Sequence, residues 1–253
     1  MEKKKVSFLY KIVRWLVWLF SPKYKLVGAE KLPAEPCVVV GNHCQMYGPV
    51  AGEVFFPGRH DIWCAGEMMH RKEVAAYAFE DFWSFKPRWT HPFFRLLSHL
   101  IVPLSLLLFN NADTIPVYHD ARLRTTYRLS IESLQNGRNV IIFPEKNEKY
   151  NNVLYAFQDR FVDLARFYYS RSGKALDFVP LYVAPKLKTL FIGDPIRFRP
   201  DAPMVAERER ICRELAEQIT ATAAAQPLHT VIPYRNIRKR DYPKNIPVEV
   251  YHA

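Results

Sequence analysis

The sequence has few cysteines, and their spacing is irregular. The four residues, Cys37, Cys44, Cys64 and Cys212, form no C-x-x-C pair. Disulfide frameworks and zinc sites depend on regular spacing, so these side chains are expected to be reduced thiols of an intracellular protein. A signal peptide with a small-residue cleavage site is also lacking, which argues against secretion.

Long uninterrupted hydrophobic runs are lacking too. Val6–Phe20 is too short to cross a bilayer and contains Lys11 and Arg14. Pro92–Phe109 is interrupted by a proline, Pro103, and by basic and histidine side chains. Neither run predicts a single spanning helix; the second is more typical of buried or membrane-dipping helices.

Internal repeats, low-complexity segments and Gly/Ser linkers are absent as well. Short apolar, β-branched runs instead alternate with helical patterns, which favours an α/β fold with a mixed, largely parallel sheet covered by helices. The expected strands are Lys25–Gly28, Val38–Gly41, Asp61–Ala65, Thr114–Tyr118, Asn139–Phe143, Phe178–Val183 and Thr189–Gly193.

The clearest helix is predicted over Asp120–Asn136. Asp120 can cap its first turn, its apolar residues recur at i, i+4, i+8 and i+11, and Gly137 can end it. Two further helices are expected over Asn152–Ser170 and Ala202–Ala225.

Acidic residues are the minority among the charged ones. The chain has 36 Lys plus Arg against 25 Asp plus Glu, a net charge of +11, which suits anionic partners such as a membrane surface or a phosphorylated molecule. We expect an amphipathic membrane-association helix over residues 1–22, one α/β domain over 23–226 and a basic extended tail over 227–253.

Two segments indicate a membrane surface. The helix ending at Phe20 has a broad apolar face with basic residues opposite, as in an interfacial helix, although it could also pack on its own domain. Tyr77–Phe94 interleaves aromatic and basic residues. Such a segment could stack on nucleobases, form part of the core, or form a belt at a membrane interface. The two segments together favour the membrane.

Four short blocks carry the chemistry. Asn42 and His43 follow a buried strand, where α/β folds commonly place reactive groups. Downstream come IPVYHDAR (Ile115–Arg122), IIFPEKNEK (Ile141–Lys149), and FVPLYVAP with FIGDPIRF (Phe178–Phe198). This ordered set resembles the PlsC-like glycerol-phosphate and lysophospholipid acyltransferase family, over roughly residues 23–226.

The resemblance implies transfer of an acyl chain from acyl-CoA or acyl carrier protein to a lysophospholipid or glycerol-phosphate-like hydroxyl. His43 would be the general base, with Asn42 beside it, and Glu145, Phe143 and Pro144 would form the third block. The acyl carrier is a co-substrate, and neither a cofactor nor a metal is required. The implied setting is phospholipid biosynthesis, by a peripheral protein on the cytoplasmic face of the cell membrane.

The sequence departs from the family at the acid that orients the histidine. The family's aspartate falls on Gly48, which has no group to hold an imidazole. Losing the acid of a comparable triad costs about 10⁴-fold, or about 5–6 kcal/mol. We expect Glu145 or Glu148 to replace it. Otherwise the protein has a weaker activity, or binds lipid without catalysis.

The expected phosphate-binding groups are also altered. His119 falls where the family has an arginine, although Arg122 follows closely. In the third block Glu148 takes the place of another arginine, between Lys146 and Lys149. Arg122, Lys146 and Lys149 are therefore the predicted phosphate ligands, with His119 as a further substrate-binding residue.

Other chemistries are less well supported. A Cys44–His43 nucleophile would require neighbouring side chains that point apart, and His43, Cys44, His60 and Cys64 lack metal-ligand spacing. No nucleic-acid-binding motif is recognisable, and nucleic acid is not an expected partner. The expected partners are a phospholipid surface, the acyl carrier and a lysolipid acceptor.

Overall fold

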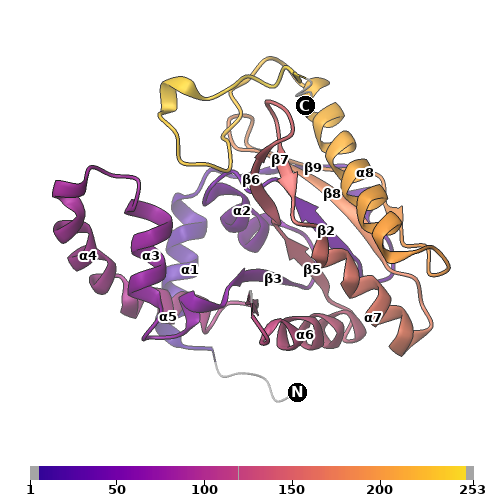
Figure 1. Ribbon diagram of the computed structural model, residues 1–253, viewed down its shortest axis with the longest axis horizontal. Helices are drawn as coiled ribbons and strands as arrows, with labels where there is room; N and C mark the ends of the chain where they lie inside the picture. The colour runs from indigo at the N-terminus through magenta and orange to yellow at the C-terminus, as the bar shows by residue number, and fades with distance from the viewer. Residues whose placement is uncertain (1–5, 119, 249–253) are drawn as a thin grey trace. The chain divides into compact units, whose positions relative to one another are not determined.

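The computed structural model describes residues 6–118 and 120–248. The chain packs into two compact units (Figure 1): Met1–Ser21 with Trp63–Arg128, and Pro22–Ile62 with Leu129–Ala253. The range 23–226, expected as one domain, contributes residues to both units. The described part of the expected tail, residues 227–248, belongs to the second unit.

A mixed, largely parallel sheet forms the centre of the second unit, as predicted. Its strands lie in the order β1-β9-β8-β2-β5-β3, and β10 pairs with β8. The pairs β1–β9, β8–β2, β2–β5 and β5–β3 are parallel, whereas β9 and β10 run antiparallel to β8. The strands are β1 Lys25–Val27, β2 Val38–Gly41, β3 His60–Ala65, β5 Asn139–Ile142, β8 Asp177–Ala184, β9 Thr189–Ile192 and β10 Ile196–Arg197.

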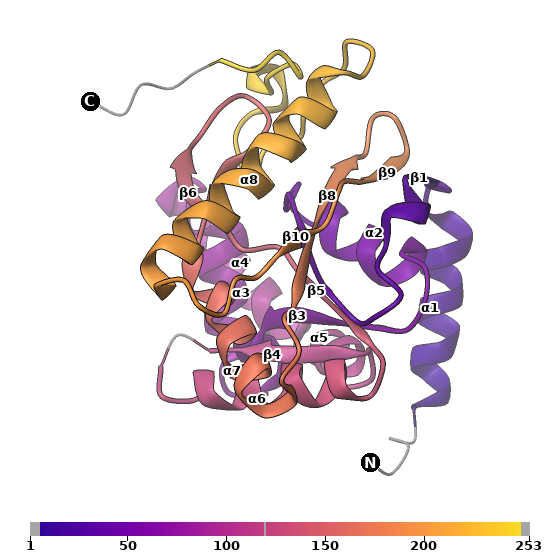
Figure 2. The ribbon, with the colours of Figure 1, turned by 90° about the vertical axis from the view of Figure 1, so that its right-hand side faces the viewer.

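Helices cover both faces of this sheet. α8 (Met204–Ala224) and α2 (Tyr47–Phe55) both contact β8, and Figure 2 shows them on opposite sides of the strands. α7 (Asp163–Ser172) packs beside α8. Because both faces are covered, β2 is buried along its whole length, as its continuous apolar sequence predicts.

A hairpin replaces the first part of the helix predicted over Asn152–Ser170. β6 (Glu145–Lys149) pairs antiparallel with β7 (Tyr155–Phe157), and the helix α7 begins only at Asp163. The Asn151 side chain accepts bonds from the amides of Val153 and Leu154, at 2.7 and 3.0 Å. This side-chain turn competes with helix formation, so the predicted start was wrong.

The first unit is mainly helical. Its α-helices are α1 (Phe8–Phe20), α3 (Val74–Trp83), α4 (His91–Leu100) and α5 (Val102–Phe109); β4 (Thr114–Val117) follows β3 in the strand order, and α6 (Leu123–Gln135) starts here and ends in the second unit. The 3₁₀ turns of the chain are Ala29–Lys31, Gly66–Met69, Arg88–Thr90, Asp159–Val162 and Lys239–Asp241. The core of this unit is small, with Met68, Val74, Ala75 and Val102 at its centre.

Several apolar side chains of the first unit are exposed. Phe8 and Phe20 of α1 are 78% and 80% exposed, and Trp89 before α4 is 84% exposed. Within the described residues no single helix has the length and apolar character needed to cross a bilayer; Arg88–Leu100 and Val102–Phe109, bent by 44°, have them only as a pair.

Residues 230–244 fold back onto the second unit as a closed loop. Thr230 and Lys244 form a bridge at its base, and the Val231 amide donates to the Pro243 carbonyl at 2.9 Å. Val231 and Ile232 are buried. We refer to residues 231–243 as the C-terminal loop; it is drawn in yellow in Figure 1.

Candidate active site

Asn42 fixes the end of β2 just before His43. Its Oδ1 accepts from the Val183 amide at 2.7 Å, and its Nδ2 donates to the Val183 carbonyl at 3.1 Å and to the Cys44 Sγ at 2.8 Å. The side chain is buried. Its polar atoms are thus already engaged in joining β2 to β8, so Asn42 acts on His43 by placing its backbone.

The turn after His43 has an unusual backbone. Cys44 and Gln45 both have positive φ, 48° and 56°, a conformation that costs a non-glycine residue about 1–3 kcal/mol. The turn brings the Gln45 carbonyl back to the ring that precedes it, with 2.6 Å between His43 Nδ1 and Gln45 O. Such strain is kept only where the surroundings hold it.

This contact determines the tautomer of His43. A carbonyl oxygen can only accept, so Nδ1 carries the proton and Nε2 keeps its lone pair. Burial lowers the pKa of His43, and the hydrogen bond to Gln45 partly opposes this effect. The ring is therefore neutral near pH 7, with Nε2 available as a base.

The position of the family's aspartate leaves no room for a side chain. A Cβ on Gly48 would lie 2.4 Å from the His43 carbonyl oxygen and 2.9 Å from that of Asn42. The Gly48 amide also donates to the His43 carbonyl at 3.1 Å. In this turn the hydrogen-bond partner of the ring is a main-chain carbonyl, that of Gln45.

Glu145 is next to His43 but bonds its main chain rather than its ring. Oε2 accepts from the His43 amide at 2.8 Å, and Oε1 accepts from the Tyr155 amide at 3.0 Å. The residue is only 2% exposed. Burial raises the pKa of Glu145 from 4.5 to about 8. The hydrogen bonds from the two main-chain amides partly oppose this rise.

The expectation that Glu145 or Glu148 orients the imidazole is therefore wrong, because neither carboxylate bonds a ring nitrogen of His43. Glu145 is occupied by two amides, and Glu148 lies exposed on β6, where its carboxylate pairs with Lys146 at 2.6 Å. Burial along β6 is confined to its first residue: Glu145 is buried, whereas the strand is exposed from Asn147 onward.

Two of the predicted phosphate ligands are neutralised by carboxylates. Lys146 pairs with Glu148. In the first unit, Arg122 pairs with Asp120 at 2.8 Å and with Glu73 at 3.6 Å, and lies over the Tyr118 ring. Neither cation is left uncompensated.

The other predicted substrate-binding residues are dispersed. Lys149 is exposed at the end of β6. The Pro144 carbonyl accepts from the Gln158 amide at 2.7 Å, which supports the β6–β7 hairpin. His119 lies outside the described residues.

Aromatic rings enclose the imidazole. Phe143 meets His43 edge-on with 5.9 Å between ring centroids. Tyr234 meets it edge-on from the C-terminal loop at 5.1 Å, and Tyr155 lies 6.4 Å from Tyr234.

The C-terminal loop also holds Gln45. The Gln45 Nε2 donates to the Tyr242 hydroxyl at 3.0 Å and to the Arg235 carbonyl at 3.3 Å. The sequence gave no signal for Gln45 or Tyr234, since one acts through its main chain and the other is 191 positions beyond His43 (234 minus 43).

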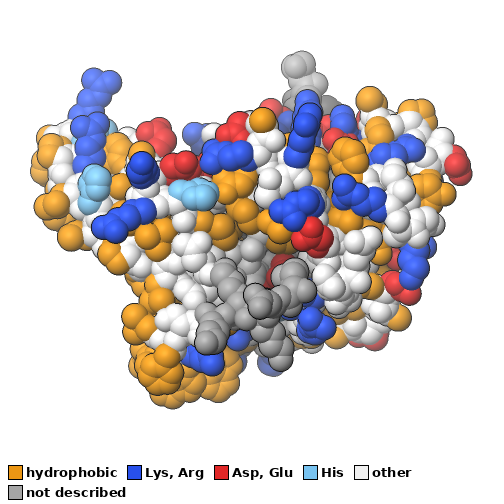
Figure 3. All heavy atoms as spheres, turned by 90° about the horizontal axis from the view of Figure 1, so that it is seen from below, with side chains coloured by type: hydrophobic (Ala, Val, Ile, Leu, Met, Phe, Trp, Pro, Cys, Tyr) orange, Lys and Arg blue, Asp and Glu red, His pale blue; other side chains and the backbone are white. Residues whose placement is uncertain are grey.

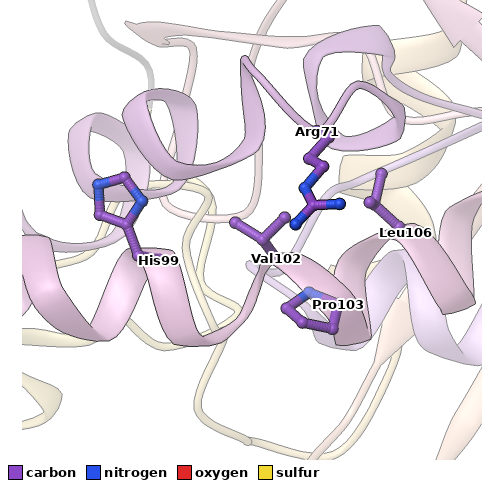
Figure 4. A pocket seen from close by; sticks show the side chains of 5 residues that line it. All are labelled: Arg71, His99, Val102, Pro103 and Leu106. Atoms are coloured by element: carbon purple, nitrogen blue, oxygen red, sulfur yellow. The ribbon is translucent and has the colours of Figure 1, made fainter.

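A separate hollow lies in the first unit. It has a volume of about 360 Å³ and is lined by Arg71, His99, Val102, Pro103 and Leu106 (Figure 4). The Arg71 side chain points toward the helix α5 (Figure 4). A cation above apolar walls is suited to an amphipathic anion.

Comparison with known proteins gives one similar structure to report. No protein-family model and no curated protein matches the chain. The crystal structure of the 1-acyl-sn-glycerophosphate (LPA) acyltransferase PlsC from Thermotoga maritima is similar at 17% identity and a TM-score of 0.43, over 86% of this chain and 83% of that one.

Proposed function

We propose that the chain is an acyltransferase that moves an acyl chain from a thioester to the hydroxyl of a lysophospholipid or glycerol-phosphate-like acceptor. The observation that carries the proposal is the His43 imidazole, whose Nδ1 is bonded to the Gln45 carbonyl at 2.6 Å. The bond leaves Nε2 with its lone pair, at the carboxyl end of a buried parallel strand.

The proposed reaction starts at His43 Nε2. The nitrogen takes the proton of the acceptor hydroxyl as its oxygen attacks the thioester carbonyl carbon. The C–O ester bond forms and the C–S bond breaks. The thiolate leaves and recovers the proton from Nε2, so the ring returns to the neutral tautomer that Gln45 holds.

A carbonyl partner makes His43 a weaker base than a carboxylate partner would. In a serine protease triad, replacing the acid by an amide costs about 10⁴-fold, largely because the imidazole takes the wrong tautomer. Here the Gln45 carbonyl selects the productive tautomer, so that part of the penalty is avoided. The charge stabilisation of the imidazolium is still lacking, which predicts a slow enzyme.

The donor and acceptor classes come from the block pattern. The order of the blocks around His43, Arg122, Glu145 and Pro180 resembles enzymes that use acyl-CoA or acyl carrier protein and a phosphorylated lysolipid or glycerol acceptor. The net charge of +11 suits such anionic substrates. The proposed role is in phospholipid metabolism.

The proposed location is the surface of an anionic membrane, on its cytoplasmic side. Large apolar side chains of the first unit are exposed, among them Phe8, Phe20, Trp89 and Phe93. Figure 3 shows hydrophobic and basic side chains intermixed over the left-hand part of one face, where Figure 1 places α3 and α4. Aromatic and basic side chains together favour the headgroup region of a bilayer.

The test is acyl transfer from radiolabelled acyl-CoA to lysophosphatidate by the wild type and by His43→Ala. General-base catalysis contributes about 10²–10⁴-fold, so His43→Ala is expected to lose at least about 100-fold in rate. His91→Ala, in the first unit, serves as the matched control and should retain the rate. Equal turnover by the wild type and His43→Ala would remove His43 as the base.

A second candidate function is lipid binding without catalysis. The observation that favours it is the ring of Tyr234, which packs against His43, together with the absence of a carboxylate on the imidazole among the described residues. This candidate predicts saturable binding of acyl-CoA or lysophosphatidate with no acyl transfer by the wild type.

A further inference from the structure

An anionic acceptor needs a cation near His43. Two of the three cations expected from the sequence are paired with carboxylates, and the third, Lys149, lies at the opposite end of β6 from Glu145, which bonds the His43 amide. Lys146 is paired with Glu148, and Arg122 is paired with Asp120 and Glu73. A paired cation gains less from a phosphate, because its carboxylate must first be displaced. Another basic residue beside the imidazole would serve better.

The C-terminal loop brings the main chain of a basic residue, Arg235, to the site. Tyr234 touches the His43 ring, and the next residue, Arg235, accepts a bond from the Gln45 side chain through its carbonyl. Arg235 thus follows Tyr234, which contacts the His43 ring, and is hydrogen-bonded to Gln45, which fixes the His43 tautomer.

The Arg235 side chain is exposed, and no carboxylate pairs with it among the described residues. Its charge is felt at the site: burial raises the pKa of Tyr155, and the positive charge of Arg235 opposes that rise. Tyr155 in turn donates its amide to Glu145, which holds the main chain of His43.

The loop that carries Arg235 is anchored. Val231 and Ile232 are buried, and Tyr242 packs against the same apolar cluster as Ile232. At the base, His229 Nε2 accepts from the Tyr182 hydroxyl, with 2.7 Å between the two atoms. An anchored loop presents its side chains with less loss of conformational entropy on binding.

We propose that Arg235 binds the phosphate group of the acceptor and gives the site its preference for phosphorylated over neutral acceptors. This inference rests on the proposed acyl transfer. The planar guanidinium can donate two parallel bonds to phosphate oxygens. The hydroxyl to be acylated lies elsewhere on the same acceptor, so a bound phosphate would orient it toward His43.

The experiment compares Arg235→Gln with Arg240→Gln, a neighbouring exposed arginine of the same loop. With lysophosphatidate as acceptor, Arg235→Gln should raise KM by about tenfold or more, the size of one charge-assisted hydrogen bond. With monoacylglycerol, which lacks the phosphate, KM should be unchanged. Arg235→Lys should restore part of the loss, and Arg240→Gln should resemble the wild type.

Equilibrium binding of lysophosphatidate without any acyl donor separates this inference from the proposed reaction. Weaker binding by Arg235→Gln supports the phosphate site even if the wild type transfers no acyl group, in which case the reaction alone fails. Equal binding by Arg235→Gln, Arg240→Gln and the wild type overturns the role of Arg235, whatever the turnover. An equal rise of KM for both acceptors also overturns it.

Discussion

At the scale of single residues, two hydrogen bonds fix His43, one at its amide and one at its ring. The Glu145 carboxylate accepts from the His43 amide, and the Gln45 carbonyl accepts from the His43 Nδ1. Gly48 permits the tight turn because any Cβ there would meet the His43 carbonyl at 2.4 Å. The side-chain-free position 48 and the carbonyl partner of the ring thus belong to one backbone conformation.

Glu145 makes stability depend on pH. Burial raises its pKa from 4.5 to about 8. The folded state therefore holds a proton that the unfolded chain releases between these values. The contribution of Glu145 is full below pH 4.5 and is lost as the pH rises to about 8, by at most about 1.4 kcal/mol per pH unit.

Glu145→Gln should flatten this dependence. We expect urea denaturation to show a smaller fall in unfolding free energy between pH 5 and pH 8 for the variant than for the wild type. The variant should be less stable at pH 5, because its amide group faces a main-chain donor. Glu148→Gln, on the exposed side of the same strand, is the control. Parallel curves for Glu145→Gln and the wild type would contradict the buried proton.

The residues of the site were predictable in part. The family resemblance implied that Glu145 lies near His43, and the Glu145 carboxylate accepts from the His43 amide. The partner of the ring was not predictable, because every residue has a main-chain carbonyl. The Gln45 carbonyl reaches the ring through the positive φ angles of Cys44 and Gln45. Tyr234 was missed because a long-range contact of a tail leaves no local pattern.

At the scale of elements, hydrophobic periodicity determined most of the fold. The continuous apolar run of β2 and the stripe of α6 gave their positions to within a few residues. The β6–β7 hairpin was missed because EKNEK is charged and resembles a helix surface more than a strand. The burial of Glu145 and the turn held by the Asn151 side chain override that local preference.

Among the helices, α4 carries the most direct test of membrane binding. Its exposed Phe93, and Trp89 just before it, should insert at the headgroup level. Replacing both by serine should reduce co-sedimentation with phosphatidylglycerol-containing vesicles by at least about tenfold, since each buried aromatic side chain contributes about 1.5–3 kcal/mol.

The matched control replaces Val205 and Leu228, exposed apolar residues of the second unit, by serine. This variant should bind vesicles like the wild type. Unchanged vesicle binding by the Trp89 and Phe93 variant would assign the exposed apolar side chains of the first unit another role.

At the scale of the whole molecule, the chain is built from two units. The second unit holds His43, its main-chain partners and the C-terminal loop, and the first unit exposes large apolar side chains. The unit bounds at Ser21, Trp63 and Arg128 could not be predicted from the sequence. The first unit combines two stretches that are separate in the sequence, and no linker marks their ends.

The pH dependence of acyl transfer is the most direct test of His43 as a neutral base held by a carbonyl. The kcat/KM for lysophosphatidate should fall on the acid side with an apparent pKa below the ordinary imidazole value of 6.5, because burial lowers the pKa of His43. A wild-type acid limb above 6.5, or an unchanged profile and rate in His43→Ala, would contradict this role.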